Sequence, residues 1–132
     1  MKFLPIFFLL SLNLAVIQIS HDYDEDFTFE LTVTSETDAS AQFDIVITGY
    51  SLSDDGSQTS FELKENGLET PYKLILKNGE YTAEIRNKSK DVVIQSKVQG
   101  IRNGERGGFG SSDSNQPTLH FGVGGKMSVK DN

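Results

Sequence analysis

The chain has 132 residues, a formal net charge of −7 at pH 7, no cysteine and no tryptophan. Its length suits one domain with a single core, and the absence of cysteine excludes disulfides, thiolate metal sites and a cysteine nucleophile. Its acidity argues against nucleic acids and anionic lipid surfaces as partners, because both attract proteins through clustered lysine and arginine.

The first twenty residues have the layout of a secretory signal peptide. Lys2 precedes an apolar run from Phe3 to Ile19, and the chain then turns sharply polar. The run has seventeen residues, whereas a comfortable membrane-spanning helix needs about 20. We therefore expect residues 1–20 to be cleaved and the protein to be secreted or periplasmic. An uncleaved membrane anchor through residues 3–19 is the alternative.

Residues 21–26 are acidic and carry the D-x-D-x-D spacing that opens a calcium-binding loop. That motif continues with a glycine and a later bidentate glutamate, but here Phe27 follows and begins an apolar alternation. We interpret residues 21–26 as a solvated spacer before one domain at 27–132. The sequence predicts no metal site and no cofactor.

From residue 27 onward, apolar and polar residues alternate with a period of two, which is typical of half-buried strands. Phe27, Phe29, Leu31 and Val33 share one parity in the first run. Comparable runs follow at 41–48, 61–63, 72–76, 81–85, 92–98, 119–123 and 127–129. About seven to eight short strands without a helical stripe predict an all-β, antiparallel, two-sheet β-sandwich. A small barrel is the alternative.

Turn residues separate these runs. Asparagine–glycine pairs tolerate the positive φ angles of a type I′ turn, so Asn78-Gly79 is the strongest hairpin signal. Asn103-Gly104 is a second candidate, and Asn66-Gly67 marks a third turn. Residues 54–57 and 87–91 are expected to form polar loops. Pro71 cannot donate a hydrogen bond, so its strand is predicted to begin there or to lie at an edge.

Residues 102–116 are rich in glycine and serine and predict a long loop between two strands. This segment carries Arg102, Arg106 and Phe109 in an otherwise acidic protein. Arginine and aromatic side chains are favoured anchors at binding interfaces, so these three residues are our candidate binding residues. The alternative is that Phe109 packs beneath the loop while both arginines are solvated.

The sequence offers no arrangement suited to catalysis. Its two histidines are His21 and His120, and the alternation around His120 predicts that its side chain points away from the core. Glu80 and Glu84 are predicted to be solvated on outward strand faces. Because no nucleophile, base or acid pair stands at a suggestive spacing, we predict no catalytic residues and no enzyme activity.

The order of landmarks is similar to that of the exported domain of the mycobacterial MmpS-like proteins, over roughly Leu31 to Asp113. The matching stretches are 42–45, 68–73, 81–87, 98–105 and 111–112. The resemblance implies an Ig-like sandwich behind an N-terminal anchor, and a role as accessory partner of membrane exporters of lipids and siderophores. It assigns no functional residue.

Together these features predict a non-catalytic exported domain that binds another envelope or extracellular protein. Binding would use either an exposed strand edge or the 102–116 segment. Two alternatives remain open. One is a membrane-anchored accessory subunit of an envelope transporter. The other is a carbohydrate-binding module, which is disfavoured because tryptophan is absent and most tyrosine and phenylalanine residues have inward parity.

Overall fold

The structure, a computed structural model, describes residues 27–123 and 126–131. The predicted signal or anchor segment 1–20 and the acidic spacer 21–26 lie outside the described residues. The described part forms nine β-strands. They are β1 (Phe27–Ser35), β2 (Gln42–Leu52), β3 (Gln58–Glu69), β4 (Tyr72–Lys77), β5 (Gly79–Asn87), β6 (Ile94–Arg102), β7 (Glu105–Ser112), β8 (Pro117–Gly122) and β9 (Lys126–Asp131).

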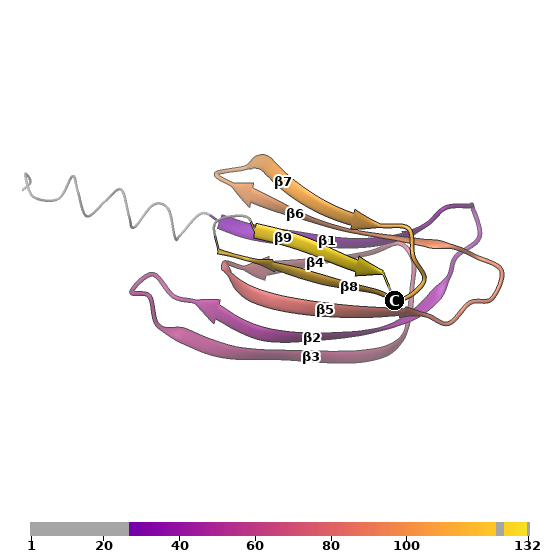
Figure 1. The fold of residues 1–132 in the computed structure, drawn as a ribbon, viewed down its shortest axis with the longest axis horizontal. Coiled ribbons are helices and arrows are strands. Elements are labelled where there is room, and N and C mark those ends of the chain that lie inside the picture. Colours follow the sequence, from indigo (N-terminus) through magenta and orange to yellow (C-terminus); the bar gives the residue numbers. More distant parts are fainter. Residues whose placement is uncertain (1–26, 124–125, 132) are drawn as a thin grey trace, which may run out of the picture.

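The strands form two antiparallel sheets that pack face to face (Figure 1). Sheet A has the order β4-β1-β6-β7, and sheet B has the order β3-β2-β5-β8-β9. The predicted all-β antiparallel sandwich is therefore confirmed, and the alternative of a closed barrel is wrong. The strands are more numerous and partly longer than expected, since β2 has 11 residues and β3 has 12.

The core lies between the two sheets. It is formed by the apolar residues that the alternating pattern placed on the inward face of each strand. In β1, Phe27, Phe29, Leu31 and Val33 are buried, while the residues between them are partly exposed. Phe29 is fully buried and makes edge-to-face contacts with Phe27, Tyr81 and Phe121 at ring-centroid distances of 5.0, 6.1 and 5.0 Å. These contacts join both sheets, because β1 lies in sheet A while β5 and β8 lie in sheet B.

The Asn78-Gly79 pair is not a hairpin turn, contrary to the prediction. It joins β4 of sheet A to β5 of sheet B, so the chain crosses between sheets here. Leu52 N–H donates to the carbonyl of Asn78 at 2.8 Å, and a Cβ at Gly79 would lie 2.1 Å from the carbonyl oxygen of Tyr50. Glycine is needed at this position for close approach to β2.

Asn103-Gly104 is the hairpin turn that the sequence predicted. Both residues have positive φ, at 52° and 79°, as a type I′ turn requires, and they connect β6 to β7. The prediction of a long loop at 102–116 is wrong, because β7 occupies residues 105–112. Its composition is rich in glycine and serine, which are poor signals for a strand.

Asn66-Gly67 lies inside β3 rather than ending it. Gly67 has a φ of 69°, and the register between β2 and β3 shifts at this point. Gly67 N–H donates to Asp44 Oδ1 of β2 at 3.0 Å, so the pair forms a bulge. Other turn predictions are confirmed: residues 53–57 connect β2 to β3, and β4 begins directly after Pro71 at the edge of sheet A.

Candidate functional site

The candidate residues Arg102 and Arg106 lie on neighbouring strands rather than in a loop. Arg102 ends β6, and its guanidinium carbon lies 5.2 Å from the ring centroid of Phe27, a cation–π geometry. Arg106 lies near the start of β7 and donates from Nη1 to Glu30 and Gln99 at 2.7 and 3.0 Å. Phe109 also lies in β7, where its backbone is paired with Gln99.

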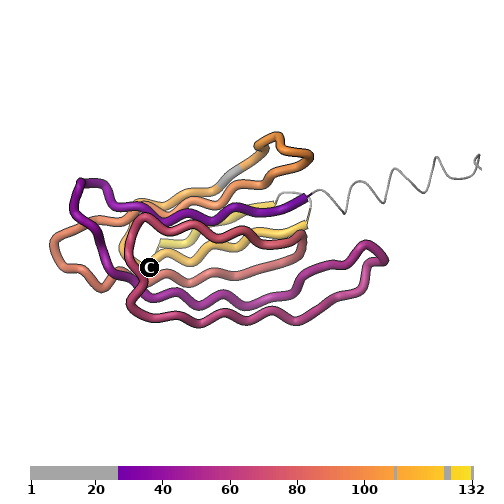
Figure 2. The backbone as a smooth tube through the Cα atoms, turned by 180° about the vertical axis from the view of Figure 1, so that it is seen from behind, coloured from indigo at the N-terminus to yellow at the C-terminus, as the bar shows by residue number. Residues whose placement is uncertain are grey.

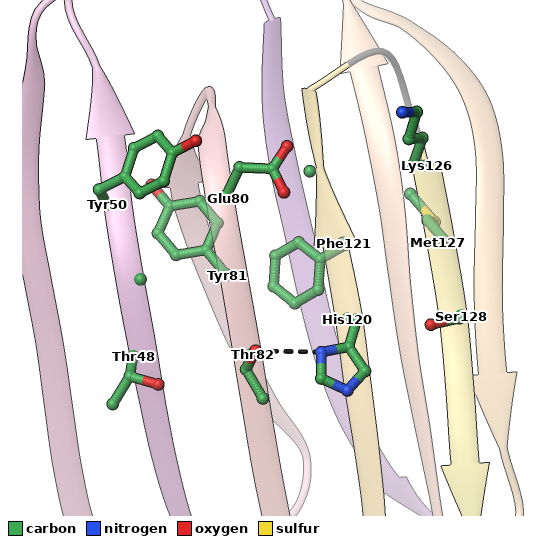
Figure 3. Close-up of a pocket in the computed structure, with 12 residues that line it drawn as sticks. Thr48, Tyr50, Glu80, Tyr81, Thr82, His120, Phe121, Lys126, Met127 and Ser128 are labelled. Carbon is green, nitrogen blue, oxygen red and sulfur yellow. Dashed lines mark hydrogen bonds between the residues drawn. The ribbon is translucent and has the colours of Figure 1, made fainter.

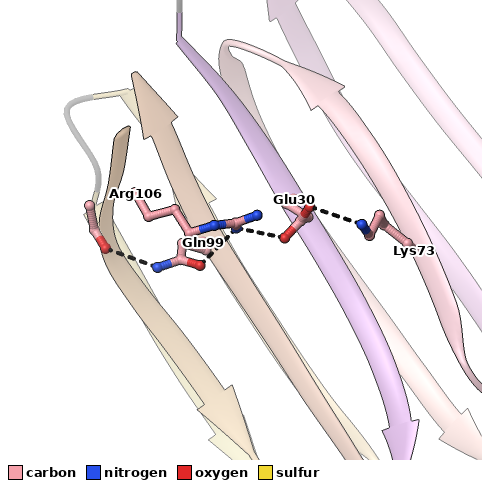
Figure 4. A network of polar contacts seen from close by, with 5 residues as sticks. Glu30, Lys73, Gln99 and Arg106 are labelled. Carbon is pink, nitrogen blue, oxygen red and sulfur yellow. Dashed lines mark hydrogen bonds and ion pairs between the residues drawn. The ribbon is translucent and has the colours of Figure 1, made fainter. Parts of the chain in front are cut away.

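Glu30 is the centre of a polar network on the outer face of sheet A (Figure 4). Its side chain is 11% exposed and lies between Arg106 and Lys73, with a Lys73 Nζ to Glu30 Oε2 distance of 3.5 Å. The hydrogen bond from Arg106, supported by the charges of Arg106 and Lys73, holds the pKa of Glu30 below its usual value. The network connects β4, β1, β6 and β7, and so fastens all four strands of sheet A.

A groove of about 370 Å³ crosses the outer face of sheet B (Figure 3). The strand registers align two neighbouring rows of side chains along it. One row contains Thr48, Thr82, His120 and Ser128. The other joins the pair Tyr50 and Glu80 to the pair Gly122 and Lys126 through the contact of the Glu80 side chain with Gly122. Because Gly122 has no side chain, the Glu80 carboxylate can lie over it, between Tyr50 at one end of the row and Lys126 at the other.

Glu80 and His120 are both held in place within the groove. Glu80 Oε2 accepts a hydrogen bond from Val123 N–H at 2.9 Å, and its carboxylate lies over Gly122, where a Cβ would be 2.4 Å from it. Thr82 Oγ1 and His120 Nδ1 are 3.0 Å apart. The prediction that His120 points away from the core is confirmed. Glu80, predicted to be solvated, is instead partly buried and hydrogen-bonded.

The groove was not predicted from the sequence. Parity could place Tyr50 and Glu80 on the same side of their strands, but their adjacency depends on the register between β2 and β5, which the sequence pattern leaves open. The prediction that Asn78-Gly79 forms a hairpin would also have placed β5 beside β4. The sequence signal that could have indicated the groove is the set of outward-facing hydroxyl, carboxyl and imidazole groups on these strands, together with a glycine in β8.

The two lateral sides of the sandwich are covered differently. On one side β7 approaches β9, since Ser112 Oγ donates to Asp131 Oδ1 and a Cβ at Gly110 would lie 3.2 Å from Val129. On the other side β4 and β3 are both edge strands, and within residues 27–123 and 126–131 no strand pairs beyond them. We call this the open side, formed by the edges of β4 and β3.

The open side leaves apolar side chains partly uncovered. Sheet B has five strands and sheet A has four, and β3 lies beyond β4 in both views of the molecule (Figures 1 and 2). The core-facing residues of β2, among them Phe43, are fully buried. In contrast, the apolar residues at the two edges are only partly buried although they pack against the core; these are Phe61, Leu63, Leu68, Tyr72 and Leu74.

Neither a metal centre nor a membrane-spanning helix is present in the described part of the chain. No group of three or more histidine, aspartate or glutamate side chains is placed there to hold a metal ion. None of its segments forms a helix of the length and apolar character needed to cross a bilayer. The acidic residues at 21–26, whose calcium-loop spacing was noted above, lie outside these residues.

Comparisons with known proteins provide no relative from which a role could be taken. The chain matches no protein-family model, no curated protein and no solved structure. The resemblance to the MmpS-like proteins therefore stays a prediction. The features of the described residues that bear on function are the groove, the Glu30 network and the open side.

Proposed function

We propose that this chain is a non-catalytic, exported binding domain that takes an extended segment of a partner protein as an additional strand beside β4. The observation that carries the proposal is the unequal width of the sheets. A segment paired with the free edge of β4 would lie over the inner face of β3. It would cover Phe61 and Leu63, which pack against the core but are only partly buried.

β4 is a better acceptor for such a strand than β3. The edge of β3 is interrupted by the bulge at Asn66-Gly67, and it carries the exposed residues Glu62, Lys64 and Glu65. A bulge of this kind interrupts the backbone ladder and discourages strand pairing. β4 has an uninterrupted register with β1 from Tyr72 to Lys77, so its opposite edge presents regular backbone donors and acceptors. Such an edge supports strand addition, with alternate side chains providing selectivity.

The exposed residues of β4 indicate the chemistry of the partner. Lys73, Ile75 and Lys77 alternate along its outer face, and Ile75 is 52% exposed. Edge lysines disfavour pairing with a basic or wholly apolar strand. A segment with carboxylates on one face and apolar side chains on the other would pair with Lys73 and Lys77 and cover the open side. We therefore propose an acidic, alternating segment as the natural partner.

Binding of synthetic peptides to the purified protein tests this proposal. The probe is a peptide of about eight residues, long enough for a strand, in which valine and glutamate alternate. A peptide that alternates valine and lysine is the charge control, and the acidic peptide N-methylated at alternate residues is the backbone control. We expect saturable binding of the acidic peptide, weaker binding of the basic peptide and none of the N-methylated peptide.

Two charge reversals locate the binding edge. Lys77→Glu is expected to weaken binding of the acidic peptide, whereas Lys130→Glu, on β9 at the far side of sheet B, is the matched control and should leave it unchanged. Equal affinities for the acidic, basic and N-methylated peptides would contradict strand addition. Equal losses of peptide affinity in both lysine variants would contradict the placement of the bound peptide at β4.

The exported state is tested separately by the intact mass of the protein produced in its native host. A mass that begins near His21 supports a secreted or periplasmic domain. A full-length mass in the membrane fraction would contradict cleavage and favour the membrane-anchored alternative, in which residues 3–19 are retained. Strand addition at β4 is compatible with either result, so the two experiments test different parts of the proposal.

A further inference from the structure

We propose that the groove on the outer face of sheet B is a second binding site, and that its ligand is a neutral saccharide. The site is independent of the open side, since it lies on the outer face of β2, β5, β8 and β9, whereas the open side is formed by the edges of β4 and β3. Its volume of about 370 Å³ is at the small end of the range for ligand sites.

The position of the groove disfavours an extended peptide as its ligand. Strands β2, β5 and β8 are each paired with a neighbour on both sides, so their backbone groups are engaged in the sheet. A peptide recognised through its main chain needs a free strand edge, which the floor of this groove does not provide. Recognition here depends on side chains alone.

Those side chains match a ligand rich in hydroxyl groups. Thr48, Thr82 and Ser128 can each donate and accept hydrogen bonds, the Glu80 carboxylate accepts them, and Lys126 donates them. Glu80 is held by Val123 N–H at 2.9 Å and His120 by Thr82 at 3.0 Å. Both groups are thereby oriented before a ligand arrives, which lowers the entropic cost of binding.

Charge and shape favour a neutral sugar ring over an anion. Glu80 faces the same groove as Lys126, so the site contains both signs of charge, and the whole chain is acidic with a net charge of −7. The Glu80 carboxylate occupies the space above Gly122, and Tyr50 lines one end of the row (Figure 3). An aromatic ring with an apolar face and a polar hydroxyl suits the apolar face of a pyranose ring. Tyr50 is thus an outward-facing exception to the inward parity of most aromatic residues.

Titration with cellotriose and maltotriose, followed by amide NMR shifts of the purified protein, tests this inference. We expect at least one trisaccharide to bind with a dissociation constant of about 1 mM or tighter. The shifts should be confined to residues around Thr82, His120 and Ser128. If neither sugar shifts these resonances at about ten times that concentration, or if the shifts lie elsewhere, the saccharide site is contradicted.

Three variants decide whether the groove is responsible. Tyr50→Leu removes the aromatic ring and should weaken binding at least tenfold. Gly122→Ala should weaken it, because the new Cβ would lie 2.4 Å from the Glu80 carboxylate and would displace it from its hydrogen bond with Val123 N–H. Glu84→Gln, on the same face and exposed but outside the groove, is the matched control. Unchanged sugar affinity in Tyr50→Leu would contradict the site even if Gly122→Ala failed to fold. All three variants should retain peptide binding at β4.

Discussion

Arg106 and Glu30 form a hydrogen-bonded ion pair across the width of β6, although they are 76 positions apart in the chain. Arg106 Nη1 lies 2.7 Å from Glu30 Oε1, and Gln99 of the intervening strand accepts a second hydrogen bond from the same nitrogen at 3.0 Å. The β6–β7 hairpin is thereby fastened to the centre of sheet A. Segment 102–116 is thus held by contacts that its own composition does not reveal.

We predict that the unfolding free energy of Arg106→Gln falls less than that of the wild type when the pH is lowered from 7 into the acid range. In the folded protein the hydrogen bond from Arg106 lowers the pKa of Glu30 below its ordinary value of 4.5. A carboxyl with a lowered pKa stabilises the folded state above its unfolded pKa, and this contribution is lost as the pH falls through the folded pKa. The difference in unfolding free energy between the two proteins should therefore be present at pH 7 and disappear in acid.

Urea denaturation at several pH values between 7 and 3 measures this difference. Arg86→Gln is the matched control, because Arg86 forms a longer contact of 3.5 Å with the more exposed Glu84. A constant offset between wild type and Arg106→Gln across the whole pH range would mean that Arg106 stabilises the hairpin by packing, not through the ionised Glu30.

Gly79→Ala is expected to destabilise the fold by about 1–3 kcal/mol, the usual cost of forcing a group into a packed position. The added Cβ would lie 2.1 Å from the carbonyl oxygen of Tyr50 and 2.8 Å from Ser51 Cα, so the β4–β5 crossing would have to move away from β2. Gly108→Ala is the control, because a Cβ there meets nothing within 4 Å. Equal thermal midpoints of the two variants would contradict the close approach of β2 at Gly79.

Phe29→Ala should cost about 3–5 kcal/mol of unfolding free energy. Phe29 is completely buried and its ring contacts aromatic residues of both sheets, so its removal leaves a cavity between the sheets. Ile75→Ala removes an apolar side chain that is 52% exposed and should change stability by no more than about 0.5 kcal/mol. Chemical denaturation of both variants measures the contrast, and similar losses would contradict the assignment of the two faces of sheet A.

Alkaline pH should destabilise the protein through Tyr81. Burial raises the pKa of Tyr81 to about 12, from an ordinary value of 10.0. The unfolded chain therefore loses this proton first, and stability falls as the pH rises from about 10 towards 12. Tyr81→Phe should reduce that fall, while costing about 1 kcal/mol at neutral pH through loss of the 2.8 Å hydrogen bond from Tyr81 Oη to the carbonyl of Lys77. An unaltered alkaline profile in the variant would assign the fall to other groups.

Alternation was enough to predict the sheets and the core. Successive side chains of a strand point to opposite faces, so every second residue lies on the same face. The alternation in β1 therefore indicated correctly which residues are buried, namely Phe27, Phe29, Leu31 and Val33. Pairing and connection were harder to predict. Asn78-Gly79 has the composition of a hairpin turn, but its glycine is required by a close backbone contact with Tyr50 of β2, the neighbouring strand in sheet B.

β7 was missed for a related reason. Its glycines at 107, 108 and 110 have little intrinsic preference for strands, and the strand is held through pairing with β6 and the contact between Arg106 and Glu30. The groove also depended on long-range register, since Tyr50, Glu80 and His120 come from three strands. Local patterns specify which side of a strand a residue occupies, but not which strand lies beside it.

Amide hydrogen exchange with and without the alternating valine–glutamate peptide tests the central claim, the vacant strand position beside β4, most directly. We predict that saturating peptide slows exchange of β4 amides between Tyr72 and Lys77 whose N–H groups lie on the free edge, and leaves β7 and β9 unchanged. Unaltered exchange throughout β4 at saturation, or protection confined to β7 and β9, would contradict it.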